Sequence, residues 1–200
     1  MTPAPGERLG IFGGTFDPPH VGHLVAAINV RHALALDRVL LIVANVPWQK
    51  VGSRPLSSAA DRLAMVQAAV EGIDGLEASA TEIDRGGESY TIDTVDELLA
   101  ADPSRRLFVI VGRDAAAGMP TWERADELRE RATLVVVDRP GSDPELPAGW
   151  TFHHVEVPRL EISSTELRDR VATGRPLDYL VPAGTIACLT ARRLYREPCP

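Results

Sequence analysis

Short, continuous apolar runs alternate along the chain with longer stretches in which apolar residues recur every three or four positions. Runs that are apolar on both faces are typical of strands in a parallel sheet whose two faces are covered by helices. The alternation predicts an α/β fold, a doubly wound parallel sheet with right-handed crossovers. The predicted buried strands are 8–12, 38–44, 107–111 and 133–138, with weaker strand patterns at 76–82 and 152–157, and the predicted helices are 21–36, 57–70, 91–100 and 121–132.

Two further predicted helices, 163–174 and 183–195, follow one another without a strand pattern between them. We therefore expect a C-terminal helical appendage packed on the sheet. The chain is predicted to be a single domain. Within it we expect a sheet core at about residues 8–160 and appended helices at about residues 161–196. Two stretches rich in proline, glycine and serine, 45–58 and 139–150, have the composition of mobile loops.

The acidic balance of the chain limits its partners. The 200 residues carry a formal net charge of −7, whereas binding to a nucleic-acid backbone requires a basic face. No apolar run approaches the length of a membrane span, and the first residues lack the pattern of a signal peptide. Cys188 and Cys199 have no C-x-x-C spacing, which favours a reducing compartment. We expect a cytoplasmic protein without nucleic-acid or membrane partners, and a homo-oligomer stays open.

The stretch GIFGGTFDPPHVGH follows the first predicted strand. Ligands of doubly wound sheets bind beyond the carboxyl ends of the strands, which is where this stretch begins. Gly13 and Gly14 allow backbone amides to approach an anion closely, and the Thr15 hydroxyl adds a donor. His20 and His23 lie near the start of the next helix, where amide groups and the helix dipole favour phosphate. The stretch therefore predicts an anion site.

Two other interpretations of this stretch are weaker. Paired glycines after a strand also occur in tight strand-to-helix turns, and His20-x-x-His23 has the spacing of a metal pair. A structural zinc site needs further ligands, and no cysteine or additional histidine lies nearby at metal spacing. An anion is the better match to the residues present.

A second cluster, ISSTELR, begins one of the late helices. Ser163 and Glu166 have the spacing of a capping box, which would be purely structural. Ser163, Ser164 and Thr165 also bring hydroxyl groups to a helix N-terminus, and Arg168 follows within about one turn. A chain with two such anion sites is expected to bind a polyphosphate.

GGTFDPPHVGH together with ISSTELR resembles the nucleotidyltransferase superfamily that is marked by H-x-G-H and S-S-T-x-x-R. Within it the chain is similar to bacterial nicotinate-nucleotide adenylyltransferases, from about residue 9 to about residue 195. The resemblance implies a Rossmann-like sheet and transfer of AMP from ATP to nicotinate mononucleotide. The products would be nicotinate adenine dinucleotide and pyrophosphate, formed in NAD biosynthesis without a covalent intermediate. Supporting motifs are SYTIDTV (89–95), GRD (112–114), MPTW (119–122) and YLVP (179–182).

The same resemblance implies residue roles toward ATP. His23 would stabilise charge on the transferring α-phosphoryl group, and Asp114 would accept hydrogen bonds from the ribose hydroxyls. Arg113 departs from the small residue usual at the middle of GRD, and it would either crowd the nucleotide or reach a phosphate. The residues implied in ATP binding are Gly13, Gly14, Thr15, Phe16, His20, His23, Gly112, Asp114, Ser163, Ser164, Thr165 and Arg168, and the catalytic residues among them are His20, His23 and Arg168.

For the acceptor, Trp122 would stack on the pyridine ring and amides at Tyr90 and Thr91 would bind the carboxylate. Lys50 and Arg54 are candidates for contact with the acceptor phosphate. Each has a structural alternative: Trp122 as core packing on an amphipathic helix, Thr91 as the cap of a helix, and the loop cations as solvated side chains. Mg²⁺ would bridge the ATP phosphates and be held largely by substrate and water.

Alternative functions remain open on the sequence. The acceptor phosphate is already an anion at neutral pH, because its second pKa is near 6, so no general base is required. The ATP motifs fit a related enzyme with another acceptor, such as nicotinamide mononucleotide or phosphopantetheine. A non-catalytic nucleotide-binding regulator and a structural zinc protein are further alternatives.

Overall fold

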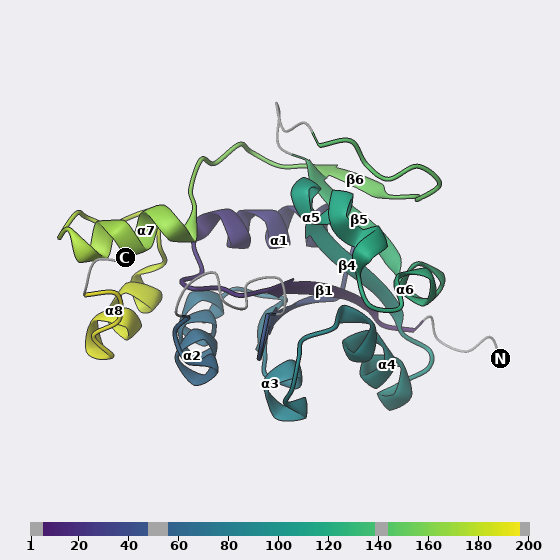
Figure 1. Cartoon of the computed structure of the whole chain (residues 1–200), viewed down its shortest axis with the longest axis horizontal. Coiled ribbons are helices and arrows are strands. Elements are labelled where there is room, and N and C mark those ends of the chain that lie inside the picture. Colours follow the sequence, from purple (N-terminus) through teal and green to yellow (C-terminus); the bar gives the residue numbers. More distant parts are fainter. Residues whose placement is uncertain (1–5, 48–55, 139–143, 197–200) are drawn as a thin grey trace. The chain divides into compact units, whose positions relative to one another are not determined.

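The structure is a computed structural model, and it describes residues 6–47, 56–138 and 144–196 (Figure 1). Contacts divide the chain into two compact units. The first unit consists of Met1–Gly13, Ala26–Leu40 and Tyr90–Arg159, and the second of Gly14–Val25, Leu41–Ser89 and Leu160–Pro200. The prediction of a single domain with an appended helical part stays a prediction.

The described residues form one six-stranded sheet in the order β3-β2-β1-β4-β5-β6. Parallel pairing joins β1 to β4, β4 to β5 and β5 to β6. The order runs outward from β1 in one direction and from β4 in the other, as in a doubly wound sheet. The predicted Rossmann-like α/β fold is therefore confirmed. The strands are β1 (Arg8–Gly14), β2 (Arg38–Val43), β3 (Leu76–Ser79), β4 (Arg106–Gly112), β5 (Thr133–Asp138) and β6 (His153–Glu156).

In the first unit, the central strands are buried on both faces, as their continuous apolar runs predicted. Residues 107–111 of β4 and 134–137 of β5 are all buried. The helices of this unit are α4 (Thr91–Ala101), α5 (Arg113–Gly118) and α6 (Ala125–Arg131), with a 3₁₀ turn, η2 (Met119–Thr121), before α6. Helix α4 packs against α6, and α6 packs against β5. Helix α1 (Val21–Ala33) begins in the second unit and continues into the first.

In the second unit, α2 (Ala59–Val70) packs against α8 (Ala183–Ala191), as Figure 1 shows. A buried hydrogen bond joins the two helices. The Thr185 hydroxyl donates to the Met65 carbonyl at 3.0 Å. A Cβ atom at Gly184 would lie 2.7 Å from the Ala68 carbonyl oxygen, so this crossing requires glycine. The apolar core between these helices and α7 (Ser164–Ala172) contains Met65, Leu167, Leu177, Val181 and Leu189.

Most predicted elements differ from the observed ones by one or more residues at an end, and three of these differences have a local cause. The strand predicted at 76–82 ends at Ser79, because the Ser79 hydroxyl accepts the Thr81 amide and starts α3 (Thr81–Arg85). The helix predicted at 121–132 begins only at Ala125, because Arg124 has a φ of 47°. The helix predicted at 183–195 ends at Ala191, and the chain then turns through Arg193 and Tyr195, which have positive φ. Within the described ranges, no helix has the length and apolar character needed to cross a membrane.

Candidate functional site

The loop after β1 is buried from its second residue onward. Phe16, Asp17 and His20 are at most 4% exposed. A Cβ atom at Gly14 would lie 2.8 Å from the Phe16 ring, whereas a Cβ atom at Gly13 would meet nothing within 4 Å. Only Gly14 is therefore required by packing, and the open space beside Gly13 leaves its backbone accessible to a ligand.

The two histidines at the start of α1 form a close, tilted pair of rings. Their ring centroids lie 3.8 Å apart, and the Phe16 ring meets that of His23 edge-on at 5.0 Å. The His20 amide donates to Nδ1 of His23 at 3.2 Å. Because Nδ1 accepts this bond, the proton of the neutral imidazole is assigned to Nε2. His23 thus presents Nε2–H as a hydrogen-bond donor, which suits an anionic ligand.

Hydrogen bonds join the second anion motif directly to the first. The Ser164 hydroxyl donates to the Pro18 carbonyl at 2.9 Å, and Nη1 of Arg168 donates to the Asp17 carbonyl at 2.8 Å. Arg168 is 7% exposed, and its Nη2 donates to the Thr165 hydroxyl at 3.0 Å. The guanidinium thus lies between the loop and α7. The structure brings these two predicted motifs together within the second unit.

The capping box predicted at the start of α7 is only half formed. Ser163 is the N-cap, and its hydroxyl accepts the Glu166 amide at 3.1 Å. The Glu166 carboxylate does not close the box, because it pairs with Arg170 at 3.0 Å. Ser163 and Thr165 are exposed, so their hydroxyls remain accessible at the helix end.

Arg62 supports the loop from α2, and the sequence analysis did not identify it. Its guanidinium is buried, with 1% of the residue exposed. Nη1 donates to the carbonyls of Thr15 at 3.0 Å and Ala44 at 2.6 Å. Nη2 donates to the Asn45 carbonyl and Nε to the Ser57 carbonyl, each at 3.0 Å. The available signal was a charged residue on the apolar face of a predicted helix.

Asp17 and Tyr195 are a second pair that sequence reasoning missed. Asp17 is 1% exposed, and the Tyr195 hydroxyl donates to its Oδ1. Burial and the Asp17 carboxylate both raise the pKa of Tyr195, so the phenol stays protonated. No sequence pattern indicates this pairing, because Tyr195 follows α8 in a turn of irregular backbone.

The predicted ribose site lies in the first unit. Gly112 ends β4 and is the N-cap of α5, and Asp114 is exposed in the first turn of that helix. Arg113 is directed toward β5: its Nη1 donates to Asp138 at 2.7 Å and its Nε to the Pro144 carbonyl at 3.0 Å.

Asp138 also contacts Nδ1 of His154 at 2.6 Å. Burial raises the pKa of Asp138, but the hydrogen bonds with His154 and Arg113 outweigh it and leave the pKa below its ordinary value. Asp138 therefore holds the Arg113 guanidinium by charge as well as by a hydrogen bond.

The predicted acceptor residues also lie in the first unit. Trp122 precedes α6 in extended backbone, so the alternative that placed it on an amphipathic helix is wrong. Tyr90 is the N-cap of α4 and Thr91 its first helical residue, so the expected Thr91 cap is also wrong. Trp122 lines a cavity of about 540 Å³ together with Arg124, Trp150 and neighbouring residues. Lys50 and Arg54 lie outside the described residues.

No group of three or more histidine, cysteine, aspartate or glutamate residues is arranged to hold a metal ion within the described ranges. The donors around the loop are N–H and O–H groups, which bind anions. The roles assigned to individual residues stay predictions.

Comparisons with known proteins identify the family. The family model described as Cytidylyltransferase-like matches residues 11–170. A Frankia casuarinae protein named "Probable nicotinate-nucleotide adenylyltransferase" is 46% identical over 187 residues, which are 92% of this chain and 98% of the relative. A Corynebacterium kroppenstedtii protein of the same name is 44% identical over 192 residues, 94% of this chain and 90% of the relative. The chain belongs to the nicotinate-nucleotide adenylyltransferase family.

Solved structures agree with this family at the level of the fold. Plasmodium falciparum nicotinic acid mononucleotide adenylyltransferase complexed with NaAD has a TM-score of 0.78 at 15% identity, covering 96% of this chain and 98% of the other. The same enzyme complexed with APC has a TM-score of 0.75 at 15% identity, with the same coverage. The nicotinate-nucleotide adenylyltransferase family therefore accounts for the sheet order as well as for the sequence motifs.

Proposed function

We propose that this chain transfers the adenylyl group of ATP to nicotinate mononucleotide, which yields nicotinate adenine dinucleotide and pyrophosphate in NAD biosynthesis. The observation that carries the proposal is the pair of hydrogen bonds from Ser164 to Pro18 and from Arg168 to Asp17. They join the second anion motif to the loop that leads into the histidine pair, so one polyphosphate can contact both. Relatives that are 44% and 46% identical carry the name of this activity.

In this proposal the ATP phosphates bind at both motifs. Nε2–H of His23 donates to a non-bridging oxygen of the α-phosphate, and the backbone beside Gly13 approaches the same group. Arg168, Ser164 and Thr165 bind the β- and γ-phosphates, which leave as pyrophosphate. The residues proposed to bind ATP are Gly13, Gly14, Thr15, Phe16, His20, His23, Gly112, Asp114, Ser163, Ser164, Thr165 and Arg168.

The reaction is a single in-line displacement. A phosphate oxygen of nicotinate mononucleotide forms a bond to the α-phosphorus of ATP, while the bond from that phosphorus to the pyrophosphate oxygen breaks. No proton has to move, because the attacking oxygen is already ionised at neutral pH. The chain therefore contributes orientation and donors for the charge that develops on the α-phosphoryl oxygens.

Mg²⁺ would be held by ATP phosphate oxygens and water rather than by side chains of this chain, which is its usual environment in nucleotide sites. The side chains around the loop fit this arrangement, because guanidinium, imidazole N–H and hydroxyl groups suit phosphate oxygens better than a cation. When bound, the ion neutralises part of the phosphate charge.

For the acceptor, Trp122 stacks on the pyridine ring, and the first amides of α4, at Tyr90 and Thr91, bind the carboxylate. Lys50 binds the acceptor phosphate. A cationic pyridine ring favours an electron-rich indole, and a helix N-terminus favours an anion. Only the second preference selects nicotinate mononucleotide over its amide, because the cationic ring is common to both acceptors.

The decisive experiment is pyrophosphate release by the purified protein with ATP, Mg²⁺ and nicotinate mononucleotide. We expect release in the wild type, a loss of at least about a hundredfold in His23→Ala, and no loss in His32→Ala, an exposed histidine in the last turn of α1. Release no greater than that of His23→Ala would overturn the proposal.

An acceptor panel separates the alternative functions. Turnover with nicotinamide mononucleotide or phosphopantetheine in preference to nicotinate mononucleotide would indicate a related enzyme with another acceptor. Thermal stabilisation by ATP without product from any acceptor would indicate a nucleotide-binding regulator.

A further inference from the structure

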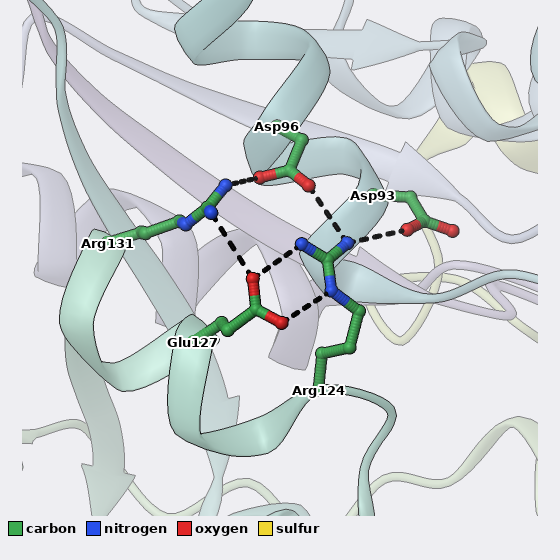
Figure 2. Close-up of polar contacts among 5 residues, drawn as sticks. All are labelled: Asp93, Asp96, Arg124, Glu127 and Arg131. Carbon is green, nitrogen blue, oxygen red and sulfur yellow. Dashed lines mark hydrogen bonds and ion pairs between the residues drawn. The ribbon is translucent and has the colours of Figure 1, made fainter.

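Five charged side chains connect α4 to the segment that contains α6 (Figure 2). Asp93 and Asp96 lie on α4, and Glu127 and Arg131 lie on α6. Arg124 is the residue directly before α6. Arg124 contacts all three carboxylates, whereas Arg131 contacts only Asp96 and Glu127. We call these five residues the α4–α6 cluster. Arg124 is its centre, as the dashed lines in Figure 2 show.

The contacts of Arg124 fix a backbone conformation that arginine rarely adopts. Its φ is 47°, in the left-handed region, directly before the first turn of α6. Nε and Nη2 donate to the two Glu127 oxygens at 2.9 and 2.7 Å, and Nη1 donates to Asp96 at 2.9 Å. The paired, fork-like contact with one carboxylate restricts the orientation of the guanidinium. Glu127 and Asp96 therefore hold both the side chain and the turn that bears it.

This turn comes two residues after Trp122, the residue proposed to stack on the acceptor ring. The buried Nε1–H of Trp122 has no hydrogen-bond acceptor among the described residues. The Trp122 amide donates to the Met119 carbonyl at 3.0 Å, so the backbone is tied on its amino side. On its carboxyl side the tie is Arg124, and the two residues line the same cavity. Loss of Arg124 would therefore leave the indole free to shift.

Asp93 connects Arg124 to the other half of the acceptor site. It lies in the first turn of α4, the same helix end whose amides are proposed to bind the nicotinate carboxylate. An uncompensated Asp93 would repel that carboxylate. Nη1 of Arg124 lies 3.5 Å from Asp93 Oδ1, and these side chains are 34% and 37% exposed. Arg124 thus offsets a negative charge where the acceptor brings its own.

We propose that Arg124 is a positioning and specificity-determining residue for the acceptor. Through Asp96 and Glu127 it holds the Trp122 segment against α4, and through Asp93 it favours an acid over an amide on the pyridine ring. Arg124 acts through other residues, so it is not a catalytic residue. This inference rests on the proposed function, because it concerns the same acceptor.

The test compares Arg124→Ala with Arg131→Ala, a matched variant that loses contacts with Asp96 and Glu127 but none with Asp93. For each, kcat and KM are measured with nicotinate mononucleotide, nicotinamide mononucleotide and ATP. Arg124→Ala should raise KM for nicotinate mononucleotide about three- to tenfold, lower the acid-to-amide ratio of kcat/KM, and leave KM for ATP unchanged. Arg131→Ala should leave both KM values and the acid-to-amide ratio of kcat/KM near those of the wild type.

A second substitution isolates the charge. Adding Asp93→Asn to Arg124→Ala removes the exposed carboxylate and should restore part of the acid-to-amide ratio, while KM for nicotinate mononucleotide stays above that of the wild type. Arg124→Lys keeps the charge but not the fork, so it should retain that ratio better than Arg124→Ala. Thermal unfolding identifies variants that fold poorly.

Three outcomes would overturn the inference: equal effects of Arg124→Ala on both acceptors, equal effects of the two alanine variants, or a change confined to the melting temperature. A wild-type protein that forms no dinucleotide contradicts the proposed function itself. An active wild type with an unaffected Arg124→Ala variant contradicts only the inference.

Discussion

The Tyr195 hydroxyl donates a 2.6 Å hydrogen bond to Oδ1 of Asp17, a residue 178 positions earlier in the chain. Asp17 is 1% exposed, and its carbonyl oxygen accepts from Arg168. The C-terminal part thus holds Asp17 at two groups: the turn after α8 binds its carboxylate, and α7 binds its backbone carbonyl. The C-terminal part of the second unit therefore stabilises the loop on which the histidine pair depends.

Tyr195→Phe removes this hydrogen bond and keeps the ring. At neutral pH we expect the free energy of unfolding to fall by about 1–3 kcal/mol, because a buried carboxylate loses a donor. Urea denaturation of the wild type and the variant measures this difference. Tyr179→Phe is the suitable control, because it removes the same hydroxyl from a residue that is 95% exposed. Phe12→Tyr is not suitable, because it adds a hydroxyl elsewhere.

The same pair predicts an alkaline pH dependence. The folded state raises the pKa of Tyr195 above its ordinary value of 10.0 through burial and the Asp17 carboxylate. The unfolded chain loses this proton first, so the wild type loses stability as the pH rises above about 10. Phenylalanine does not titrate there, so the gap between wild type and Tyr195→Phe should narrow at about pH 11. A gap that stays constant would contradict the buried, protonated phenol.

Gly13→Ala and Gly14→Ala form a matched pair that separates packing from ligand binding. Gly14→Ala should lower the melting temperature, because its methyl group would meet the buried Phe16 ring at 2.8 Å. Gly13→Ala should leave the melting temperature unchanged, because its methyl group has open space. If phosphate approaches the backbone at Gly13, this variant raises KM for ATP. An unchanged KM would remove Gly13 from the proposed binding residues.

Ser163 allows the cap of α7 to be separated from a contact with phosphate. Ser163→Ala should lower the free energy of unfolding by about 1 kcal/mol, because the Glu166 amide loses its acceptor. Ser163→Asp should recover that stability, since aspartate is an equally good cap. Its negative charge should nevertheless raise KM for ATP, and equal KM values for the two variants would argue against a phosphate near Ser163.

Asp138→Asn tests the contact that holds Arg113 at β5. The variant should be less stable than the wild type by about 1 kcal/mol at neutral pH, because the partly buried ion pair loses its charge. The pKa of Asp138 is lowered in the fold, so its contribution is present above the ordinary value of 3.8 and is lost as the pH falls below it. Chemical denaturation at pH 7 and at about pH 3 should show the difference become smaller in acid, because the contribution is lost as the pH falls through the lowered pKa.

The continuous apolar runs made the sheet predictable, because a strand buried on both faces leaves a pattern that no exposed element shares. The prediction for β5 agrees with the structure to the residue. The two motifs could be picked out as candidate anion sites, since glycines, hydroxyls and histidines beside a predicted helix start are local signals, and their binding of an anion stays a prediction.

The rest depended on interactions between distant residues. The 121–132 stretch has helical periodicity throughout, yet Arg124 adopts a left-handed backbone because Glu127, Asp96 and Asp93 surround its guanidinium. Two of these three partners belong to another helix, and no pattern around Arg124 contains them. Tyr195 is similar, because its partner Asp17 lies almost a full chain length away. Local patterns cannot predict such tertiary contacts.

Arg62 has a consequence for how this enzyme family diversifies. The carbonyls of Asn45 and Ser57 flank the stretch that contains Lys50, and both accept hydrogen bonds from the guanidinium that also holds Thr15. Because both ends are fixed at one group, a change in the length between them adds little entropic cost. Insertions, deletions or grafts from relatives should therefore be tolerated there without displacing the phosphate loop. The acceptor contact proposed for Lys50 could then change separately from the contacts proposed for ATP.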